Sequence, residues 1–300
     1  MFTGCGTALV TPFRKDLSLD ESTLRRLARR QIDAGINFLV PCGTTGENPT
    51  LTRAEHLRVV EIALEEAKGK TPVLAGAGGY NTAEVIELAR ELKAMGVDGI
   101  LSVTPYYNKP TQEGLYQHFK AIAAAVSLPV VVYSVAGRTG VNVEPATLKR
   151  LAGIDNIVGV KEASGNIGQM AAIVNQVPER FHVLSGDDAI TLPLVALGGR
   201  GVISVVSNEI PAEMTRLAQL CLKNDFPAAR EVQRKYLPLM EINFVESNPI
   251  PVKAAMALMG LLEPVWRLPL VAPKAENLEK IRNVLESLGL IERVHAASRD

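Results

Sequence analysis

Residues 157–161 have the sequence IVGVK, a short apolar run that ends in a lysine. A run of this length that is rich in β-branched residues is typical of a buried strand. Seven more runs of this kind occur, and each is followed by a segment with helical periodicity. They are residues 6–10, 36–40, 72–76, 99–103, 129–133, 181–185 and 201–205. The stretch that ends in Lys161 is therefore one of eight repeated β-then-α units.

The segments between the runs predict eight helices. Asp20 is a candidate N-cap for the first, and Thr52 with Glu55 forms a capping box for the second. The helices are expected at residues 20–34, 53–68, 82–95, 112–126, 145–151, 166–175, 187–197 and 211–223. Strands that are apolar throughout are buried on both faces of a parallel sheet. Eight such units predict an α/β fold of the (β/α)8 TIM-barrel type. An open doubly wound sheet is the alternative, although no glycine fingerprint follows the first strand.

The pattern changes at residue 225, after which only helical periodicity remains. We expect three more helices, at residues 225–244, 251–259 and 275–288. The chain is therefore divided into a barrel over residues 1–224, which would contain the active site, and a C-terminal helical layer over residues 225–300.

Composition excludes several classes of protein. Lys plus Arg and Asp plus Glu both number 32, so the formal net charge is zero, which argues against a nucleic-acid partner. The chain is 47% hydrophobic, yet no run of about 18 apolar residues predicts a membrane span, and no targeting segment is visible. Three scattered cysteines and four histidines show no disulfide or metal-binding pattern, so we expect no metal and a cytoplasmic location.

Lys161 is the strongest single indication of chemistry. In a β/α barrel the active site lies where the strands end, and Lys161 ends an apolar strand. It shares one side of the pleat with Ile157 and Gly159, so it would lose much of its hydration. Desolvation favours the neutral amine that attack on a carbonyl requires. The alternative is a lysine paired with Glu162 or Asp187 at the barrel rim.

Other polar side chains are expected near the same strand ends. Tyr133 ends the neighbouring strand, and its hydroxyl can relay a proton if another hydroxyl, from Thr44, Thr45 or Tyr107, holds it. A buried tyrosine that bonds only to backbone is the alternative. Arg138 is expected in a glycine-flanked loop, where its guanidinium would suit a substrate carboxylate, although a surface arginine fits the same pattern.

Taken together, these segments resemble the pyruvate-dependent Schiff-base lyases and aldolases, and within them the dihydrodipicolinate synthases. The resemblance covers nearly the whole chain. It rests on residues 41–47 (PCGTTGE), 104–110 (TPYYNKP), 137–140 (GRTG), 159–163 (GVKEA), 184–188 (LSGDD) and 248–253 (NPIPVK). It implies a TIM barrel that needs no cofactor, because pyruvate is bound as a Schiff base.

The resemblance also implies a reaction. Lys161 would form an imine with pyruvate, and the derived enamine would attack L-aspartate 4-semialdehyde in diaminopimelate and lysine biosynthesis. Tyr133 would move protons, held by Thr44 and Tyr107. In the family the tyrosine that matches Tyr107 reaches the neighbouring subunit's site, which implies a homo-oligomer, either a dimer or a homotetramer.

Binding roles follow from the same resemblance. Thr45, Gly186 and the backbone near Ile203 would bind pyruvate, and Arg138 would bind the carboxylate of the second substrate. A feedback site for L-lysine is partly matched, with a tyrosine where inhibited bacterial members usually have asparagine. Its candidate residues are Asn48, Pro49, His56, Tyr80, Glu84 and Tyr106.

One segment departs from the family pattern. Residues 134–136 (SVA) stand where Asn-Val-Pro is usual. Loss of the proline predicts a looser segment around Arg138. A serine also offers fewer hydrogen bonds than an asparagine, so we expect weaker substrate binding.

Two other functions remain open from the sequence. A sister lyase that acts on a sugar acid, such as N-acetylneuraminate or a keto-deoxy-gluconate, would share the lysine and the tyrosine. It would not usually share Arg138 or the Thr44–Thr45 pair. A non-catalytic ligand-binding barrel would have no need to retain Lys161, Tyr133 and Thr44 together.

Overall fold

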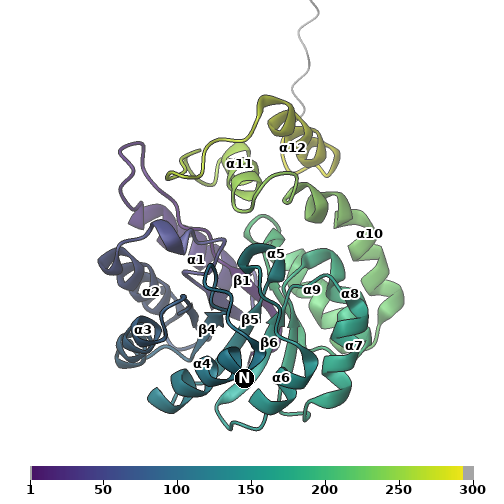
Figure 1. Cartoon of the computed structure of the whole chain (residues 1–300). Helices are drawn as coiled ribbons and strands as arrows, with labels where there is room; N and C mark the ends of the chain where they lie inside the picture. Colours follow the sequence, from purple (N-terminus) through teal and green to yellow (C-terminus); the bar gives the residue numbers. More distant parts are fainter. Residues whose placement is uncertain (1, 293–300) are drawn as a thin grey trace, which may run out of the picture.

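The computed structural model describes residues 2–292 and has eight parallel strands (Figure 1). The strands are neighbours in the order β2-β1-β8-β7-β6-β5-β4-β3. They are β1 (Gly4–Ala8), β2 (Phe38–Val40), β3 (Leu74–Gly76), β4 (Gly99–Val103), β5 (Val130–Ser134), β6 (Ile157–Glu162), β7 (His182–Ser185) and β8 (Gly201–Ser204). Contacts between β2 and β3 close the ring, since the Leu39 N–H donates to Pro72 O at 2.9 Å. The predicted barrel is confirmed, and the open sheet is excluded.

Helices surround the barrel (Figure 1). They are α1 (Glu21–Asp33), α2 (Arg53–Ala67), α3 (Thr82–Met95), α4 (Gln112–Ala125), α5 (Ala136–Thr139), α6 (Pro145–Leu151), α7 (Ile167–Gln176), α8 (Thr191–Ala196) and α9 (Pro211–Leu222). The predicted caps are present: Asp20 accepts from the Thr23 N–H, and Thr52 and Glu55 form a capping box. Local sequence therefore decides where these two helices begin.

Two segments differ from the sequence prediction. The helix expected at residues 187–197 is a 3-10 turn, η2 (Asp188–Ile190), followed by α8. The α-helix begins later than expected because the Asp188 carboxylate turns inward and accepts from the Val205 and Val206 N–H groups. The loop expected around Arg138 is the single helical turn α5, which ends at Gly140 in the left-handed conformation that glycine favours.

Each strand contributes to two cores, one inside the barrel and one between barrel and helices. Val131 and Tyr133 of β5 pack inside the barrel with residues such as Phe38, Leu101 and Ile203. Val130 and Val132 of the same strand pack outward. Alternating side chains are thus buried on both faces, which explains why the strand sequences are apolar throughout.

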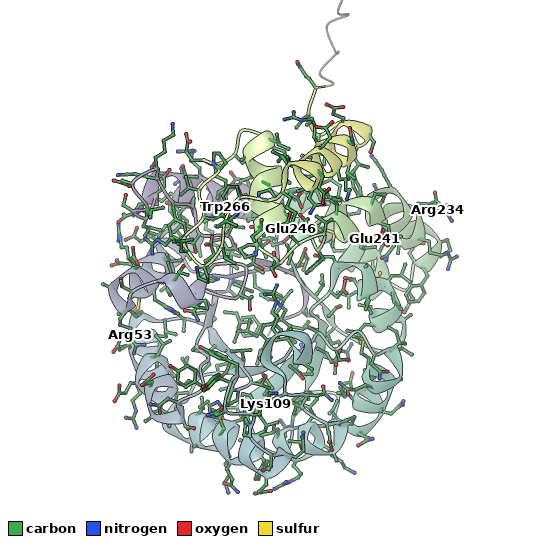
Figure 2. The ribbon with its side chains drawn as sticks, turned by 45° about the horizontal axis from the view of Figure 1, so that its top comes forward. Arg53, Lys109, Arg234, Glu241, Glu246 and Trp266 are labelled. Atoms are coloured by element: carbon green, nitrogen blue, oxygen red, sulfur yellow. The ribbon has the colours of Figure 1, made fainter. Side chains whose placement is uncertain are left out.

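Three further helices form the C-terminal layer: α10 (Phe226–Ile242), α11 (Ile250–Leu258) and α12 (Ala275–Ser287). α10 packs on α9, and α11 packs on the 3-10 turn η3 (Val206–Asn208) that follows β8. Figure 2 shows Glu246 and Trp266 of this layer on one side of the molecule and Lys109 on the other. The expected helices are confirmed, whereas the division into two parts at residue 225 stays a prediction, and residues 293–300 lie outside the described residues. None of the described helices is both long and apolar enough to cross a membrane.

Candidate active site

Lys161 and Tyr133 lie side by side at the ends of β6 and β5. They are paired in register, and both are almost fully buried, with 5% and 6% of their surface exposed. The Lys161 Nζ lies 4.3 Å from the centre of the Tyr133 ring. The two strand ends thus place an amine against an aromatic face and bring a phenol into the same space.

Among the described residues, the Lys161 side chain has no hydrogen bond and no ion pair. Glu162 points to the other side of β6, where Gln169 Nε2 donates to its Oε1 at 2.7 Å. Asp187 accepts from the Ala189 N–H at 2.9 Å and does not pair with Lys161. The ion-pair alternative is therefore wrong. A lysine that is buried without a partner is rare, and its amine is available to a ligand.

A pocket of about 110 Å³ surrounds the Lys161 amine. Its lining includes residues from β5, β6, the turn after β7, and the C-terminal layer. They are Thr45, Tyr133, Val135, Arg138, Lys161, Ala163, Gly186, Asp187, Val205, Phe244 and Asn248. A Cβ on Gly186 would lie 2.6 Å from the Ala163 Cβ and 3.2 Å from the Lys161 Cε. Glycine at this position therefore leaves room for the lysine side chain.

Asn248 joins two of the predicted site residues. Its Nδ2 donates to the Thr45 Oγ1 at 2.9 Å, and its carbonyl O accepts from the Arg138 Nη2 at 3.0 Å. Asn248 was assigned no role from the sequence; it occurs only within residues 248–253, one of the segments of the family resemblance. A short polar residue between helices, followed by proline, has no pattern that indicates such contacts.

The turn that contains Thr44 and Thr45 is fixed by a buried ion pair. Lys253 of α11 bonds to Glu47, and both side chains are fully buried. Burial lowers the pKa of Lys253, and the Glu47 carboxylate opposes that effect. Glu47 and Cys42 both have a positive φ, of 54° and 56°, which non-glycine residues adopt at a cost of about 1–2 kcal/mol each. The ion pair helps to hold the turn in this conformation.

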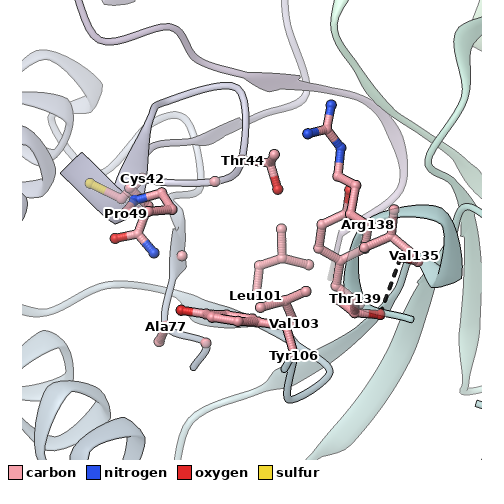
Figure 3. A pocket seen from close by; sticks show the side chains of 15 residues that line it. Cys42, Thr44, Pro49, Ala77, Leu101, Val103, Tyr106, Val135, Arg138 and Thr139 are labelled. Atoms are coloured by element: carbon pink, nitrogen blue, oxygen red, sulfur yellow. Dashed lines mark hydrogen bonds between the residues drawn. The ribbon is translucent and has the colours of Figure 1, made fainter. Parts of the chain in front are cut away.

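A second pocket, of about 220 Å³, adjoins the first (Figure 3). It shares Tyr133, Val135 and Arg138 with the Lys161 pocket and is otherwise lined largely by β2, β3 and β4 with their loops. Figure 3 shows Thr44 projecting into this space between Pro49 and Arg138. Thr44 is close to the site as predicted, but within residues 2–292 neither it nor any other side chain bonds to the Tyr133 hydroxyl.

Of the four predicted catalytic residues, Tyr107 alone lies outside both pockets, and Ile203, predicted to bind pyruvate through its backbone, lines neither of them. Its side chain is 92% exposed, and its φ is 71°. Asn108 Nδ2 donates to Tyr80 O at 3.1 Å, which ties this loop to the start of α3. The Tyr107 side chain therefore lies on the outside of the chain.

The six candidate feedback residues form two linked groups. Tyr80 and Tyr106 stack edge to face with ring centres 5.2 Å apart, and burial raises the pKa of Tyr106, with smaller contributions from Tyr80 and Glu84. His56 Nδ1 lies 2.8 Å from Asn48 Oδ1, and burial lowers the pKa of His56 to about 4. Because its pKa is this low, His56 is neutral near pH 7. Asn48, Pro49 and Tyr106 line the larger of the two pockets.

Ser134 does not face the pockets. Its Oγ accepts from the Val143 N–H at 3.1 Å and lies 3.5 Å from Asn142 Oδ1, on the outer side of β5. Together with α5, this contact fixes the segment around Arg138. Val135 O accepts from both the Arg138 and the Thr139 N–H groups, so the segment is a helical turn. That it is looser than a segment with proline stays a prediction.

Three comparisons relate the chain to known proteins. The model of the dihydrodipicolinate synthetase family matches residues 1–288. The 4-hydroxy-tetrahydrodipicolinate synthase of Koribacter versatilis is 52% identical over 295 residues, which is 98% of either chain. The crystal structure of a chloride-inhibited dihydrodipicolinate synthase from Acinetobacter baumannii complexed with pyruvate is 43% identical. It has a TM-score of 0.96 and covers 97% of this chain and 100% of that chain. The lysine-bound dihydrodipicolinate synthase of Cyanidioschyzon merolae is 40% identical. It has a TM-score of 0.93 and covers 97% of this chain and 99% of that chain.

Proposed function

This chain belongs to the dihydrodipicolinate synthetase family, and from that membership we infer that it catalyses the reaction of a 4-hydroxy-tetrahydrodipicolinate synthase. The reaction condenses pyruvate with L-aspartate 4-semialdehyde on the route to diaminopimelate and lysine. The chain is thus a Schiff-base-forming lyase. The observation that supports this function most directly is the Lys161 amine, which is buried without a partner beside Tyr133.

In the proposed mechanism the Lys161 amine attacks the keto carbon of pyruvate, and water leaves as the imine forms. Loss of a methyl proton then gives an enamine, whose terminal carbon attacks the aldehyde. The new alkoxide takes up a proton, and closure of the ring releases the lysine. Tyr133 is the proton carrier, since its ring lies 4.3 Å from the Lys161 Nζ.

Binding of the two substrates is assigned to different walls of the site. Thr45, Gly186 and the backbone near Ile203 bind pyruvate, next to the reactive amine. Arg138 binds the carboxylate of the aldehyde, because within the described part of the chain only its Nη2 is occupied, by the carbonyl of Asn248. A guanidinium with donors left free suits a carboxylate. No metal or cofactor is part of this mechanism.

Tyr107 is assigned to the site of a second copy of the chain, where it completes the proton relay with Thr44 and Tyr133. Its 92% exposure on a loop with positive φ supports this assignment. A dimer is then the smallest complete unit, and a homotetramer would be a pair of such dimers. The three cysteines are buried and free, which supports a cytoplasmic location.

L-lysine is proposed as a feedback inhibitor that binds beside Tyr106. The dihydrodipicolinate synthase of Cyanidioschyzon merolae has lysine bound in its structure. Here Glu84 supplies a carboxylate near Tyr106, and Asn48 supplies an amide that contacts His56. Tyr80 packs against Tyr106 and narrows the space available to the ligand.

Trapping with borohydride tests the proposed function. Incubation with pyruvate and borohydride should inactivate the protein irreversibly and leave a mass adduct on Lys161. In a separate coupled assay, the untreated protein should turn over L-aspartate 4-semialdehyde and should not turn over N-acetylneuraminate or a keto-deoxy-gluconate. No adduct with pyruvate would contradict an enzyme of this class. An adduct with turnover of a sugar acid alone would contradict the assigned second substrate.

A further inference from the structure

The Thr45 hydroxyl has a single hydrogen-bond partner among the described residues. That partner is the Asn248 Nδ2, which donates to Thr45 Oγ1 at 2.9 Å. Both side chains are buried, with 2% and 5% of their surface exposed, and both line the Lys161 pocket. A hydroxyl has one proton to donate and two lone pairs to accept with. The amide uses one lone pair, so the hydroxyl proton has no partner among residues 2–292.

We propose that Asn248 is a positioning residue that makes the Thr45 hydroxyl a hydrogen-bond donor to the carboxylate of the keto-acid substrate. This rests on the proposed function and deepens it. A carboxylate only accepts hydrogen bonds, so it requires a donor, and the amide prevents Thr45 from turning its proton toward Asn248. Asn248 thereby selects an anionic group in the pocket without touching it.

The side chain and the main chain of Asn248 act on different groups. The side chain contacts Thr45, whereas the carbonyl O accepts from Arg138 at 3.0 Å. A substitution at this position removes the first contact and leaves the second in place. The ion pair between Lys253 and Glu47 holds α11 against the Thr45 turn, which keeps the backbone of residue 248 near that turn.

Asn248→Asp is the decisive variant. The new carboxylate accepts the Thr45 proton and adds a negative charge beside the substrate carboxylate. We expect KM for pyruvate to rise about tenfold or more, which is the effect of losing a hydrogen bond to a charged group. The rise in KM for the aldehyde should stay below about threefold, because the Arg138 contact to the main chain is kept. The concentration of pyruvate that gives half-maximal borohydride trapping should rise with KM.

Asn248→Ala separates hydrogen-bond direction from loss of the contact. Without the amide the Thr45 hydroxyl rotates freely, so KM for pyruvate should rise less than in Asn248→Asp. If Thr45 instead donated to Asn248, aspartate would preserve that bond, and Ala would be the more damaging change. An order in which Asn248→Ala raises KM for pyruvate more than Asn248→Asp would overturn the proposal.

Two controls show whether the effect passes through Thr45. In a Thr45→Val background, Asn248→Ala should no longer change KM for pyruvate, since coupled residues show non-additive effects. Asn277→Asp is a matched change in the same helical layer, where the Asn277 Nδ2 donates to Glu246 Oε1 at 2.8 Å outside the pockets. It should lower the melting temperature and leave KM for pyruvate unchanged.

The outcome also distinguishes this inference from the proposed function. If the unmodified chain is not trapped by borohydride with pyruvate, the proposed function is wrong, and the inference loses the keto-acid substrate on which it depends. If the chain is trapped normally but Asn248→Asp changes both KM values equally, the function stands and the role of Asn248 is wrong.

Discussion

The two faces of strands β5 and β6 differ in how their polar groups are used. The side chains of Tyr133 and Lys161 point into the barrel and have no hydrogen bond among the described residues. Ser134 and Glu162, one residue further along, point outward and are bonded. Neighbours in the sequence thus have opposite surroundings, because side chains alternate along a strand. The inner groups remain available to a substrate, whereas the outer groups hold the fold.

The outer face is a closed network of amides and a carboxylate. Gln169 Nε2 donates to Glu162 Oε1 at 2.7 Å and to Asn142 Oδ1 at 3.1 Å. Asn142 Nδ2 donates back to Gln169 Oε1 at 2.8 Å. Glu162 is buried and the two amides are half-buried, so these polar groups satisfy one another and join β6 to α7. Substitutions on the two faces should therefore affect different properties.

Lys161→Ala should produce the largest effect. It removes the amine that forms the imine, so nearly all turnover should be lost, while the melting temperature should stay close to that of the native chain. Lys161→Arg should fail as well, because a guanidinium stays protonated and cannot attack. Steady-state kinetics and thermal unfolding measure the two properties. Activity close to that of the native chain would show that the inner face does not contain the nucleophile.

Tyr107→Phe tests whether one chain supplies the whole inner face. Its hydroxyl is assigned to proton transfer, so kcat should fall about a hundredfold with a smaller change in KM for pyruvate. Mixed oligomers of Tyr107→Phe and Lys161→Ala subunits should regain activity, because one of their sites has both groups intact. An unchanged kcat would reduce Tyr107 to a packing residue, and mixing without recovery would argue against a shared site.

Gln169→Ala should break the outer face and spare the inner one. It leaves the buried Oε1 of Glu162 without its donor, at a cost of about 1–3 kcal/mol in the free energy of unfolding. Denaturant unfolding measures that loss, while kcat for the folded fraction should change little. Gln117→Ala is the matched control, since Gln117 donates to Glu113 on an exposed surface. Equal destabilisation by both variants would show that the outer network contributes no more to the free energy of unfolding than an exposed hydrogen bond does.

Ala136→Pro should have the smallest effect. Ala136 is the first residue of α5, a position that accepts proline. Ordering the segment around Arg138 on binding costs free energy, and one proline lowers such a cost by about 0.4–1 kcal/mol, so KM for the aldehyde should fall by no more than about two- to fivefold. KM for pyruvate should hardly change. A larger fall would contradict this prediction, and weaker aldehyde binding would show that α5 needs a backbone shape that proline prevents.

Much of the fold follows from local patterns in the sequence. Eight apolar runs separated by helical segments have one common closed arrangement, and the caps at Asp20 and Thr52 are decided within four residues. The reactive role of Lys161 could be predicted because a lysine at the end of an apolar, buried strand is unusual. The outward direction of Ser134 also follows from alternation with Tyr133, although the sequence argument placed it near the substrate.

The features that the sequence did not reveal are of two kinds: a very short helix, and contacts between residues that lie far apart along the chain. α5 has four residues, which is too few for any helical period to be visible. The Asn248 amide bonds to Thr45 across 203 positions, and Lys253 bonds to Glu47 across 206. Pairing over such distances depends on how helices pack around the barrel, and no local pattern in one sequence contains that information.

The distance between these partners has a consequence for synthesis of the chain on the ribosome. All eight strands emerge before Asn248 and Lys253, so the barrel can assemble while the turn at residues 43–47 still lacks both partners. A carboxylate buried without its counter-ion is costly, and Glu47 therefore stays hydrated at that point. The reactive pocket is among the last parts of a nascent chain to be completed, which delays its chemistry until the scaffold around it has been built.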